Sequence, residues 1–209
     1  MGPLTLLLLG KNVGDFDSMT LLPKLIAAYG EMLQLLAAER ISWVQIDEPF
    51  LVTDLEEPVA DAYAKTYRGF EKIPIKLMLT TYFGSLADNL TLAAKPGMAG
   101  IHIDAVRGAD QVKAVASALN PEQVLSIGCV DGRNIWLSDF AVISSMLKEA
   151  TGQLGLERVV VAPSWSGHII SIGQSRHSGS LRVPQKMERR FISICATATS
   201  KISCLPSLP

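Results

Sequence analysis

Six short apolar runs recur along the first 163 residues, and they constrain the fold of this chain more than any other feature. Nearly every position in each run is apolar, which is typical of strands that are covered on both faces of a parallel sheet. The sequence therefore predicts an α/β protein with a parallel sheet at its centre. The six runs are Leu4–Leu9, Trp43–Ile46, Lys76–Thr80, Gly100–Ile103, Val124–Gly128 and Val159–Val161.

Helical patterns separate these runs. The clearest follows Thr20, where the apolar residues between Leu22 and Leu36 share one stripe of a 3.6-residue period. Thr20 is the expected N-cap of this helix, and Pro23 fits in its first turn. The other predicted helices are Val59–Phe70, Gln111–Leu119, Asp139–Leu154 with Ser138 as its cap, and a weaker one after Leu86.

This alternation predicts about six parallel β/α units with no antiparallel hairpin signal between them. Two folds satisfy it, a (β/α) barrel and a doubly wound sheet. No Gly-x-Gly-x-x-Gly motif follows the first run and no phosphate-binding loop motif occurs, which lowers the odds of dinucleotide or P-loop chemistry. A closed barrel needs eight units, so six units form either an open sheet or part of a barrel.

The character of the chain changes at Ser164. Residues 164–209 hold six Lys or Arg and one acid, whereas residues 1–163 hold thirteen and nineteen. The alternation of strand and helix stops here, and only Phe191–Ala196 resembles a strand. We interpret 164–209 as a divergent, basic, Ser-rich tail that is disordered or out of frame; the alternative is a basic arm for anionic partners.

Overall composition bounds the function. Hydrophobic residues make up 48% of the chain, enough for a core, and the net charge of -1 gives no field that would attract nucleic acid or a membrane surface. The three cysteines, Cys129, Cys195 and Cys204, form no Cys-x-x-Cys pair, which is typical of a reduced protein. The N-terminus carries no signal-peptide pattern, so we expect a cytoplasmic protein.

Polar residues follow the predicted strands at their carboxyl ends, where parallel α/β folds bind ligands. Asp47 and Glu48 come first; either carboxylate could bind a ligand amine or act as a base, and Arg133 could clamp a carboxylate. The structural alternatives are that Asp47 caps the next segment and that Arg133 pairs with Asp131 or Asp104. The further candidates are Thr80, Thr81, Tyr82, His102, Asp104, Asp131, Asn134 and Ser164.

A metal site is not predicted. His102, Asp104 and Cys129 are the only evident ligands, and none of them forms a closely spaced ligand pair. His102 alternates with Ile101 and Ile103, so its side chain is expected to point into the interior of a barrel as a structural core histidine.

Six segments occur in an order that resembles cobalamin-independent methionine synthase. The resemblance covers about residues 2–164 and is specific to the interior of that enzyme's N-terminal barrel, which implies a partial TIM-type (β/α)8 barrel over 1–163. The segments are GPLTLLLLGK (Gly2–Lys11), WVQIDEPFLVTDL (Trp43–Leu55), LTTYFGSLADNL (Leu79–Leu90), GIHIDAVRG (Gly100–Gly108), LSIGCVDGRNIWLSD (Leu125–Asp139) and VVVAPS (Val159–Ser164).

The resemblance implies transfer of a methyl group from 5-methyltetrahydropteroyltriglutamate to homocysteine, without cobalamin. In the family, zinc in a C-terminal barrel activates the homocysteine thiol, and the zinc ligands are a His-x-Cys pair, a Glu and a later Cys. The comparable stretches here read TTYF, HIDAVR and APSWS, so no zinc ligand and no catalytic residue are expected in this chain. The implied role is a non-catalytic scaffold or folate-side surface, inactive without the C-terminal barrel.

The same resemblance bears on QIDEP, the end of the run at Trp43. The catalytic barrel of the family has a similar Asp-Glu-Pro strand end that helps to hold the amino acid substrate, and QIDEP is similar to an N-terminal copy of it. The expected substrate-binding residues of this chain are Asp47, Glu48, Tyr82, Asp104 and Arg133.

Two alternatives remain open. After Ser164 the family continues with a Cys-Ser-Leu-Leu-His type segment that is absent here, which favours an inactive, truncated gene product. The second alternative is an independent small barrel lyase with Asp47 or Glu48 as its general base.

Overall fold

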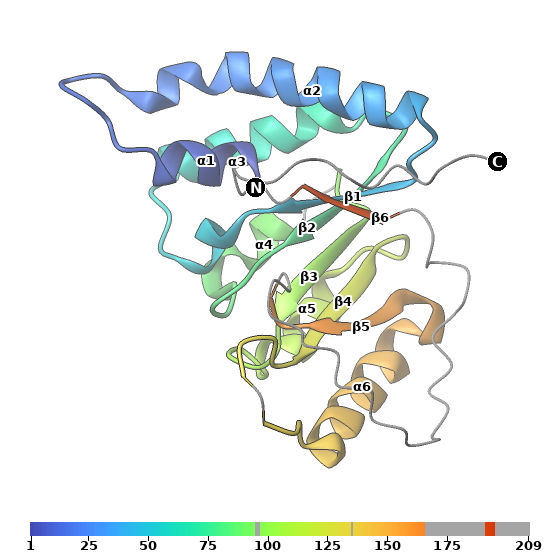
Figure 1. Cartoon of the computed structure of the whole chain (residues 1–209). Coiled ribbons are helices and arrows are strands. Elements are labelled where there is room, and N and C mark those ends of the chain that lie inside the picture. Colours follow the sequence, from blue (N-terminus) through green and yellow to red (C-terminus); the bar gives the residue numbers. More distant parts are fainter. Residues whose placement is uncertain (95–96, 135, 166–190, 195–209) are drawn as a thin grey trace.

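A parallel sheet forms the centre of the protein in a computed structural model, which describes residues 1–94, 97–134, 136–165 and 191–194 (Figure 1). The strand order is β5-β4-β3-β2-β1-β6, and every neighbouring pair is parallel. The five strands predicted from Trp43 onward are confirmed. The strands are β1 (Trp43–Asp47), β2 (Lys76–Thr80), β3 (Gly100–Asp104), β4 (Val124–Val130), β5 (Val159–Pro163) and β6 (Phe191–Ile194).

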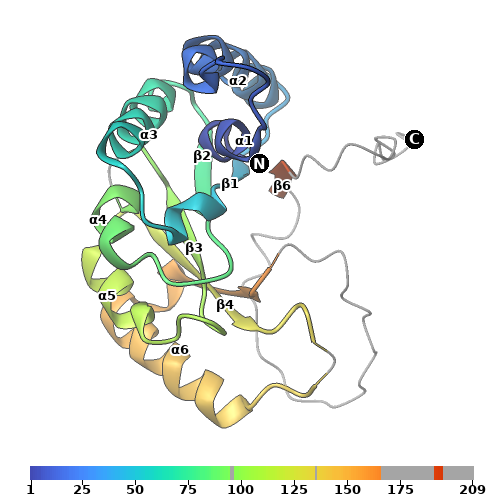
Figure 2. The same cartoon turned by 90° about the vertical axis from the view of Figure 1, so that its left-hand side faces the viewer.

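Helices cover one side of this sheet. Figure 2 shows α2 to α6 following one another around its outer side, as in a sector of a barrel. A doubly wound sheet would reverse its strand order and carry helices on both faces, whereas β1 to β5 are neighbours in sequence order. The fold is therefore compatible with a partial barrel. The helices are α1 (Pro3–Leu9), α2 (Leu22–Ala38), α3 (Glu57–Phe70), α4 (Leu90–Ala93), α5 (Gln111–Ala118) and α6 (Phe140–Leu154), with short 3-10 helices η1 (Ser18–Leu21), η2 (Pro49–Val52), η3 (Ala87–Asn89) and η4 (Leu156–Arg158).

The prediction of a strand at Leu4–Leu9 is wrong, because this run forms α1. Leucine is unbranched at Cβ and favours helix, and Pro3 occupies the first turn, where its missing N–H costs nothing. A short apolar run cannot be assigned to strand or helix by periodicity alone. The sixth strand of the sheet is Phe191–Ile194, which lies inside the one stretch of the tail predicted to resemble a strand. The other predictions for 166–209 concern residues outside the described part of the chain.

Two helix caps also differ from expectation. The carboxylate of Asp139, rather than Ser138, caps α6 by accepting hydrogen bonds from the N–H groups of Ala141 and Val142 at 2.9 and 3.2 Å. Thr20 lies inside η1, whose cap is Asp17. In both places an aspartate near the expected hydroxyl makes the capping bond, since a carboxylate also favours the positive end of the helix dipole.

The two faces of the sheet differ sharply in polarity. Register pairs Ile46, Leu79, Ile101 and Leu125 across β1 to β4, and all four side chains are fully buried in the core shared with the helices. The next register row reads Asp47, Thr80, His102 and Ser126, and successive side chains of a strand point to opposite faces. The outer face is therefore apolar and the inner face is polar.

Helix α2 carries the expected apolar stripe, in which Leu33 is fully buried and Leu25, Ile26, Tyr29 and Leu36 pack against the core. Together with η1, it makes the segment Ser18–Ala38 long and apolar enough to cross a membrane by length and composition, in the part of the chain that the structure describes. One such helix is weak evidence for a membrane span.

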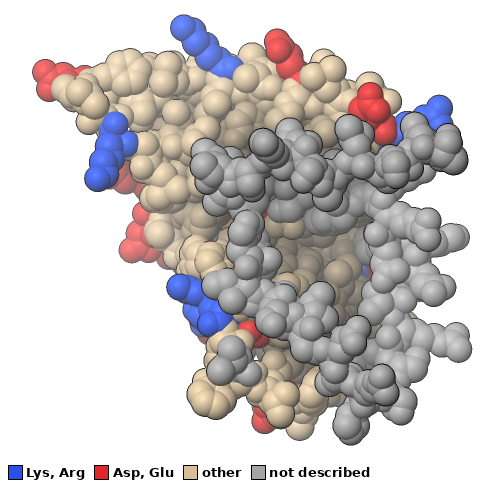
Figure 3. Space-filling model, in the orientation of Figure 1, with Lys and Arg blue, Asp and Glu red and all other residues tan. Residues whose placement is uncertain are grey.

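On the face in Figure 3, basic and acidic side chains are interspersed around the edge.

We expect Leu79→Ala to lower the free energy of unfolding by about 2–5 kcal/mol, because it opens a cavity where β2 meets the helix layer. Leu137→Ala is the matched control, since this side chain is 96% exposed, and should change stability by less than about 0.5 kcal/mol. Urea unfolding followed by far-UV circular dichroism measures both, and equal effects would contradict the assigned core.

Candidate functional site

Asp47 and Tyr82 meet at the carboxyl ends of β1 and β2. The Tyr82 hydroxyl donates to Asp47 Oδ1 at 3.2 Å, and Gln45 Nε2 lies 2.7 Å from both Asp47 Oδ1 and the Tyr82 oxygen. Burial raises the pKa of Asp47, and the hydrogen bonds from Gln45 and Tyr82 oppose this rise. The group is a pre-organised acceptor that is already engaged by protein donors.

Glu48 points away from that pair and into the protein. It is 1% exposed, and its carboxylate accepts hydrogen bonds from the backbone N–H groups of Leu4 and Thr5 at 3.2 and 2.7 Å. The hydroxyl of Tyr67 in α3 donates to it at 2.6 Å. Glu48 thus closes the amino end of α1, where backbone N–H groups have no partner within the helix.

The immediate surroundings of Glu48 leave no space for a ligand. A Cβ atom on Gly2 would overlap the Glu48 carboxylate, so the tight approach of the chain there requires glycine. Burial raises the pKa of Glu48, against the lowering effect of its hydrogen-bond donors. The structural interpretation of Glu48 follows from this geometry.

Asp104 is also saturated by protein donors. Its side chain is fully buried at the end of β3 and accepts hydrogen bonds from the N–H groups of Val106 and Arg107, both at 3.0 Å, and of Phe83 at 3.1 Å. Arg107 Nη1 adds an ion pair at 3.2 Å. Asp104 therefore joins the loop after β2 to the loop after β3.

Arg133 lies on the surface beside two aromatic rings that also contact each other. Its guanidinium carbon is 5.6 Å from the centre of the Phe83 ring and 5.0 Å from that of Trp165, both within cation–π range. Asp131 accepts a hydrogen bond from the backbone N–H of Arg133 at 3.0 Å, and Asp104 pairs with Arg107. The three side chains come from the loops after β2, β4 and β5.

His102 lies on the inner face, as its alternation with Ile101 and Ile103 predicts. Its Nδ1 is 2.9 Å from Ser126 Oγ. Among the described residues, neither its buried Nε2 nor the buried hydroxyl of Thr80 on the neighbouring strand has a hydrogen-bond partner. Burial lowers the pKa of His102 to about 4, so the ring is neutral at pH 7; Asp104 opposes this shift.

No group of three or more His, Cys, Asp or Glu residues that could hold a metal ion occurs in the part of the chain that the structure describes. Cys129 is buried, and burial raises the pKa of its thiol. Three further candidates are engaged within the protein: the Thr81 hydroxyl donates to the His102 carbonyl, the Asn134 amide donates to Asp131, and the Ser164 hydroxyl accepts the Gly132 N–H.

The predicted residues therefore form separate groups rather than one site. Asp47 meets Tyr82, whereas Glu48, Asp104 and Arg133 each face different partners. Sequence reasoning missed Gln45, Ser126, Phe83 and Trp165. Gln45 could have been found, because it precedes Asp47 by two residues on a strand and so shares its face.

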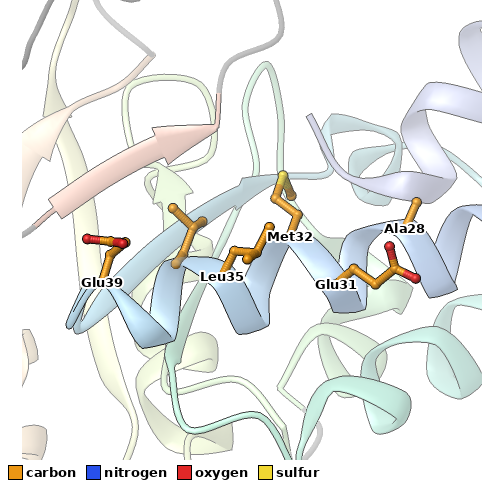
Figure 4. Close-up of a pocket in the computed structure, with 6 residues that line it drawn as sticks. Ala28, Glu31, Met32, Leu35 and Glu39 are labelled. Atoms are coloured by element: carbon orange, nitrogen blue, oxygen red, sulfur yellow. The ribbon is translucent and has the colours of Figure 1, made fainter.

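A further hollow of about 420 Å³ lies along α2 and involves none of these groups. Its lining residues belong to α2 and to Glu39, the residue that caps the carboxyl end of this helix, and Figure 4 shows their side chains along this stretch. Its polar groups are the two carboxylates of Glu31 and Glu39, so it offers no catalytic constellation. The lining residues are Ala28, Glu31, Met32, Leu35, Leu36 and Glu39.

A parallel sheet with helices along one side and polar groups at the carboxyl ends of its strands defines a (β/α)-barrel type of domain. The sequence model for the N-terminal domain of cobalamin-independent synthases matches residues 1–155. The chain belongs to this family, the cobalamin-independent methionine synthases, which are methyltransferases of methionine biosynthesis.

A solved structure agrees with this fold. A vitamin-B12-independent methionine synthase from Listeria monocytogenes superimposes with a TM-score of 0.56 at 16% sequence identity, over 71% of this chain. The match covers 49% of the Listeria chain, so the present chain spans about half the length of that protein.

Removing the Glu48 carboxylate should destabilise the fold. We expect Glu48→Ala to lower the free energy of unfolding by about 3 kcal/mol, because it leaves the buried donors of α1 and Tyr67 without their acceptor. Tyr67→Phe, which removes one donor and leaves the carboxylate bonded to two, should cost about 1 kcal/mol. Urea unfolding tests this series, with the exposed Glu122→Ala as control; a Glu48 effect no larger than the Glu122 effect would refute the role.

His102 should lower the stability of the protein as pH drops from 7 to 5, whereas the raised pKa values of Asp47 and Glu48 act in the opposite direction. The unfolded ring titrates near pH 6.5 and the folded ring near 4, so in this window only the unfolded state gains the proton. One such group is worth about 2 kcal/mol between pH 7 and 5. The contribution of His102 to the change of unfolding free energy with pH should be lost in His102→Asn. The other two histidines are present in both proteins, so they do not affect the difference between the two slopes. Identical slopes in urea unfolding would argue against a buried neutral His102.

Proposed function

We propose that this chain is the non-catalytic N-terminal barrel portion of a cytoplasmic enzyme that transfers a methyl group from 5-methyltetrahydropteroyltriglutamate to homocysteine. In this proposal it acts as a scaffold, or as the folate-side surface, for a C-terminal barrel that holds the reacting groups. Family membership supports the reaction class.

The state of Glu48 carries the proposal. A carboxylate that binds a substrate amine or acts as a base needs at least one free lone pair directed at the ligand. The Glu48 carboxylate instead faces α1 and Tyr67 and is 1% exposed. We infer that the Asp-Glu-Pro end of β1 holds the domain together, with Asp104 in a comparable structural role.

Among the five residues proposed for substrate binding, Asp47 has a carboxylate oxygen, Oδ2, that is not used in its hydrogen bonds with Gln45 and Tyr82, and Arg133 is exposed. Asp47 and Tyr82 lie at the inner end of β1 and β2, and Arg133 lies further out, where its guanidinium is exposed. We propose Asp47 and Tyr82 as polar contacts on the side that faces the second barrel.

Zinc does not fit the described residues. A zinc site that activates a thiol needs three protein ligands and an open position. His102 is the one described histidine, and around it lie Ser126 and Asp104, the latter saturated by four donors. No step of methyl transfer is therefore assigned to a metal in this portion.

We expect the purified 209-residue chain to form no methionine from 5-methyltetrahydropteroyltriglutamate and homocysteine with zinc present, and to retain less than one zinc per chain after dialysis. Amino acid analysis and plasma mass spectrometry give the two readouts. Methionine formation by the chain alone, or one tightly held zinc per chain, would overturn the non-catalytic assignment. An activity on another small substrate that Asp47→Asn abolishes would instead indicate an independent barrel lyase.

A further inference from the structure

We propose that Arg133, Phe83 and Trp165 form a binding site for a monoanionic carboxylate that is attached to an apolar or aromatic group. We call these three side chains the rim cluster. The proposal concerns ligand binding by this chain itself and does not depend on methyl transfer.

The rings orient the guanidinium of Arg133. Its central carbon lies 5.0 Å from the Trp165 ring centre and 5.6 Å from the Phe83 ring centre, while the two rings are 5.9 Å apart with planes inclined at 56°. The three separations form a triangle, so both rings lie to one side of the guanidinium rather than on its opposite faces. These contacts hold the guanidinium at the mouth, and its planar set of N–H groups can bind a carboxylate through two parallel hydrogen bonds.

The charge of Arg133 has no acidic partner among the residues that the structure describes. The ion pairs there are Arg107–Asp104 and Lys113–Glu149. Asp131 is two residues away, but its carboxylate accepts the Arg133 backbone N–H and the Asn134 side chain. A guanidinium that is oriented and unpaired at the carboxyl end of a parallel sheet is positioned for an external anion.

Phe83 is held in place at a cost. Its φ of +77° lies in the left-handed region, which is unfavourable for a bulky residue by about 1 kcal/mol or more. The buried carboxylate of Asp104 accepts the Phe83 N–H at 3.1 Å and fixes this conformation. Phe83 remains 45% exposed, so this conformation presents an aromatic residue at the mouth rather than burying it.

The surroundings select the class of anion. A single guanidinium matches one negative charge, and Asp104 and Asp131 stand in the adjoining loops, so a phosphate dianion meets more repulsion than a carboxylate does. The exposed Phe83 and the half-buried Trp165 favour a ligand whose carboxylate is joined to a flat apolar group.

Benzoate titration of the full chain tests the rim cluster. In ¹⁵N-labelled protein, benzoate should shift the indole N–H signal of Trp165, assigned through Trp165→Phe, while the signals of Trp43 and Trp136 stay in place. Arg133→Gln should weaken benzoate at least tenfold, and Arg133→Lys should weaken it severalfold, because lysine keeps the charge and loses the planar fork.

Arg68→Gln, an exposed arginine on α3, is the matched control and should bind benzoate as the parent does. Acetate should bind more weakly than benzoate, and inorganic phosphate should not bind more tightly than benzoate. The proposal is overturned by an absence of benzoate binding, by equal shifts at all three indoles, by tighter binding of phosphate, or by an Arg133→Gln chain that is folded by circular dichroism and binds benzoate like the parent.

Discussion

The buried carboxylate of Glu48 is the interaction on which the arrangement of this domain depends. A carboxyl group in an apolar interior is tolerated only when donors surround it, and here two backbone N–H groups of α1 and the Tyr67 hydroxyl do so. Because Glu48 directly follows β1, one side chain fixes α1, the first strand and α3 relative to one another. The apolar strand β1 ends in two acids and a proline for a structural reason. Pro49 starts η2, and the second acid, Glu48, anchors helix α1.

The same principle organises the other acids at the carboxyl ends of the strands. Asp104 binds three backbone N–H groups and Arg107, and Asp47 binds Gln45 and Tyr82. Because Glu48 and Asp104 are engaged internally, the mouth also offers a ligand a cationic and aromatic surface. Arg133, which contacts both Phe83 and Trp165, is an exposed cationic group at this mouth.

Much of the fold follows from local pattern. Five apolar runs became strands of one parallel sheet, and the stripe after Thr20 became α2, because burial on both faces and a 3.6-residue period leave direct marks in sequence. The run at Leu4 did not become a strand. Its pattern is ambiguous, and the deciding partner, Glu48, lies more than forty residues away.

The sequence by itself determined the fold class, the faces of the strands and the family, since periodicity and ordered motifs depend on neighbouring residues. It also determined that His102 points opposite to its flanking isoleucines. Only the tertiary structure decided which acids are hydrogen-bonded within the protein and which polar groups lie in contact. Hydrogen-bond partners such as Tyr67 for Glu48 and Phe83 for Asp104 come from distant segments, and their pairing depends on how strands and helices pack rather than on any local pattern.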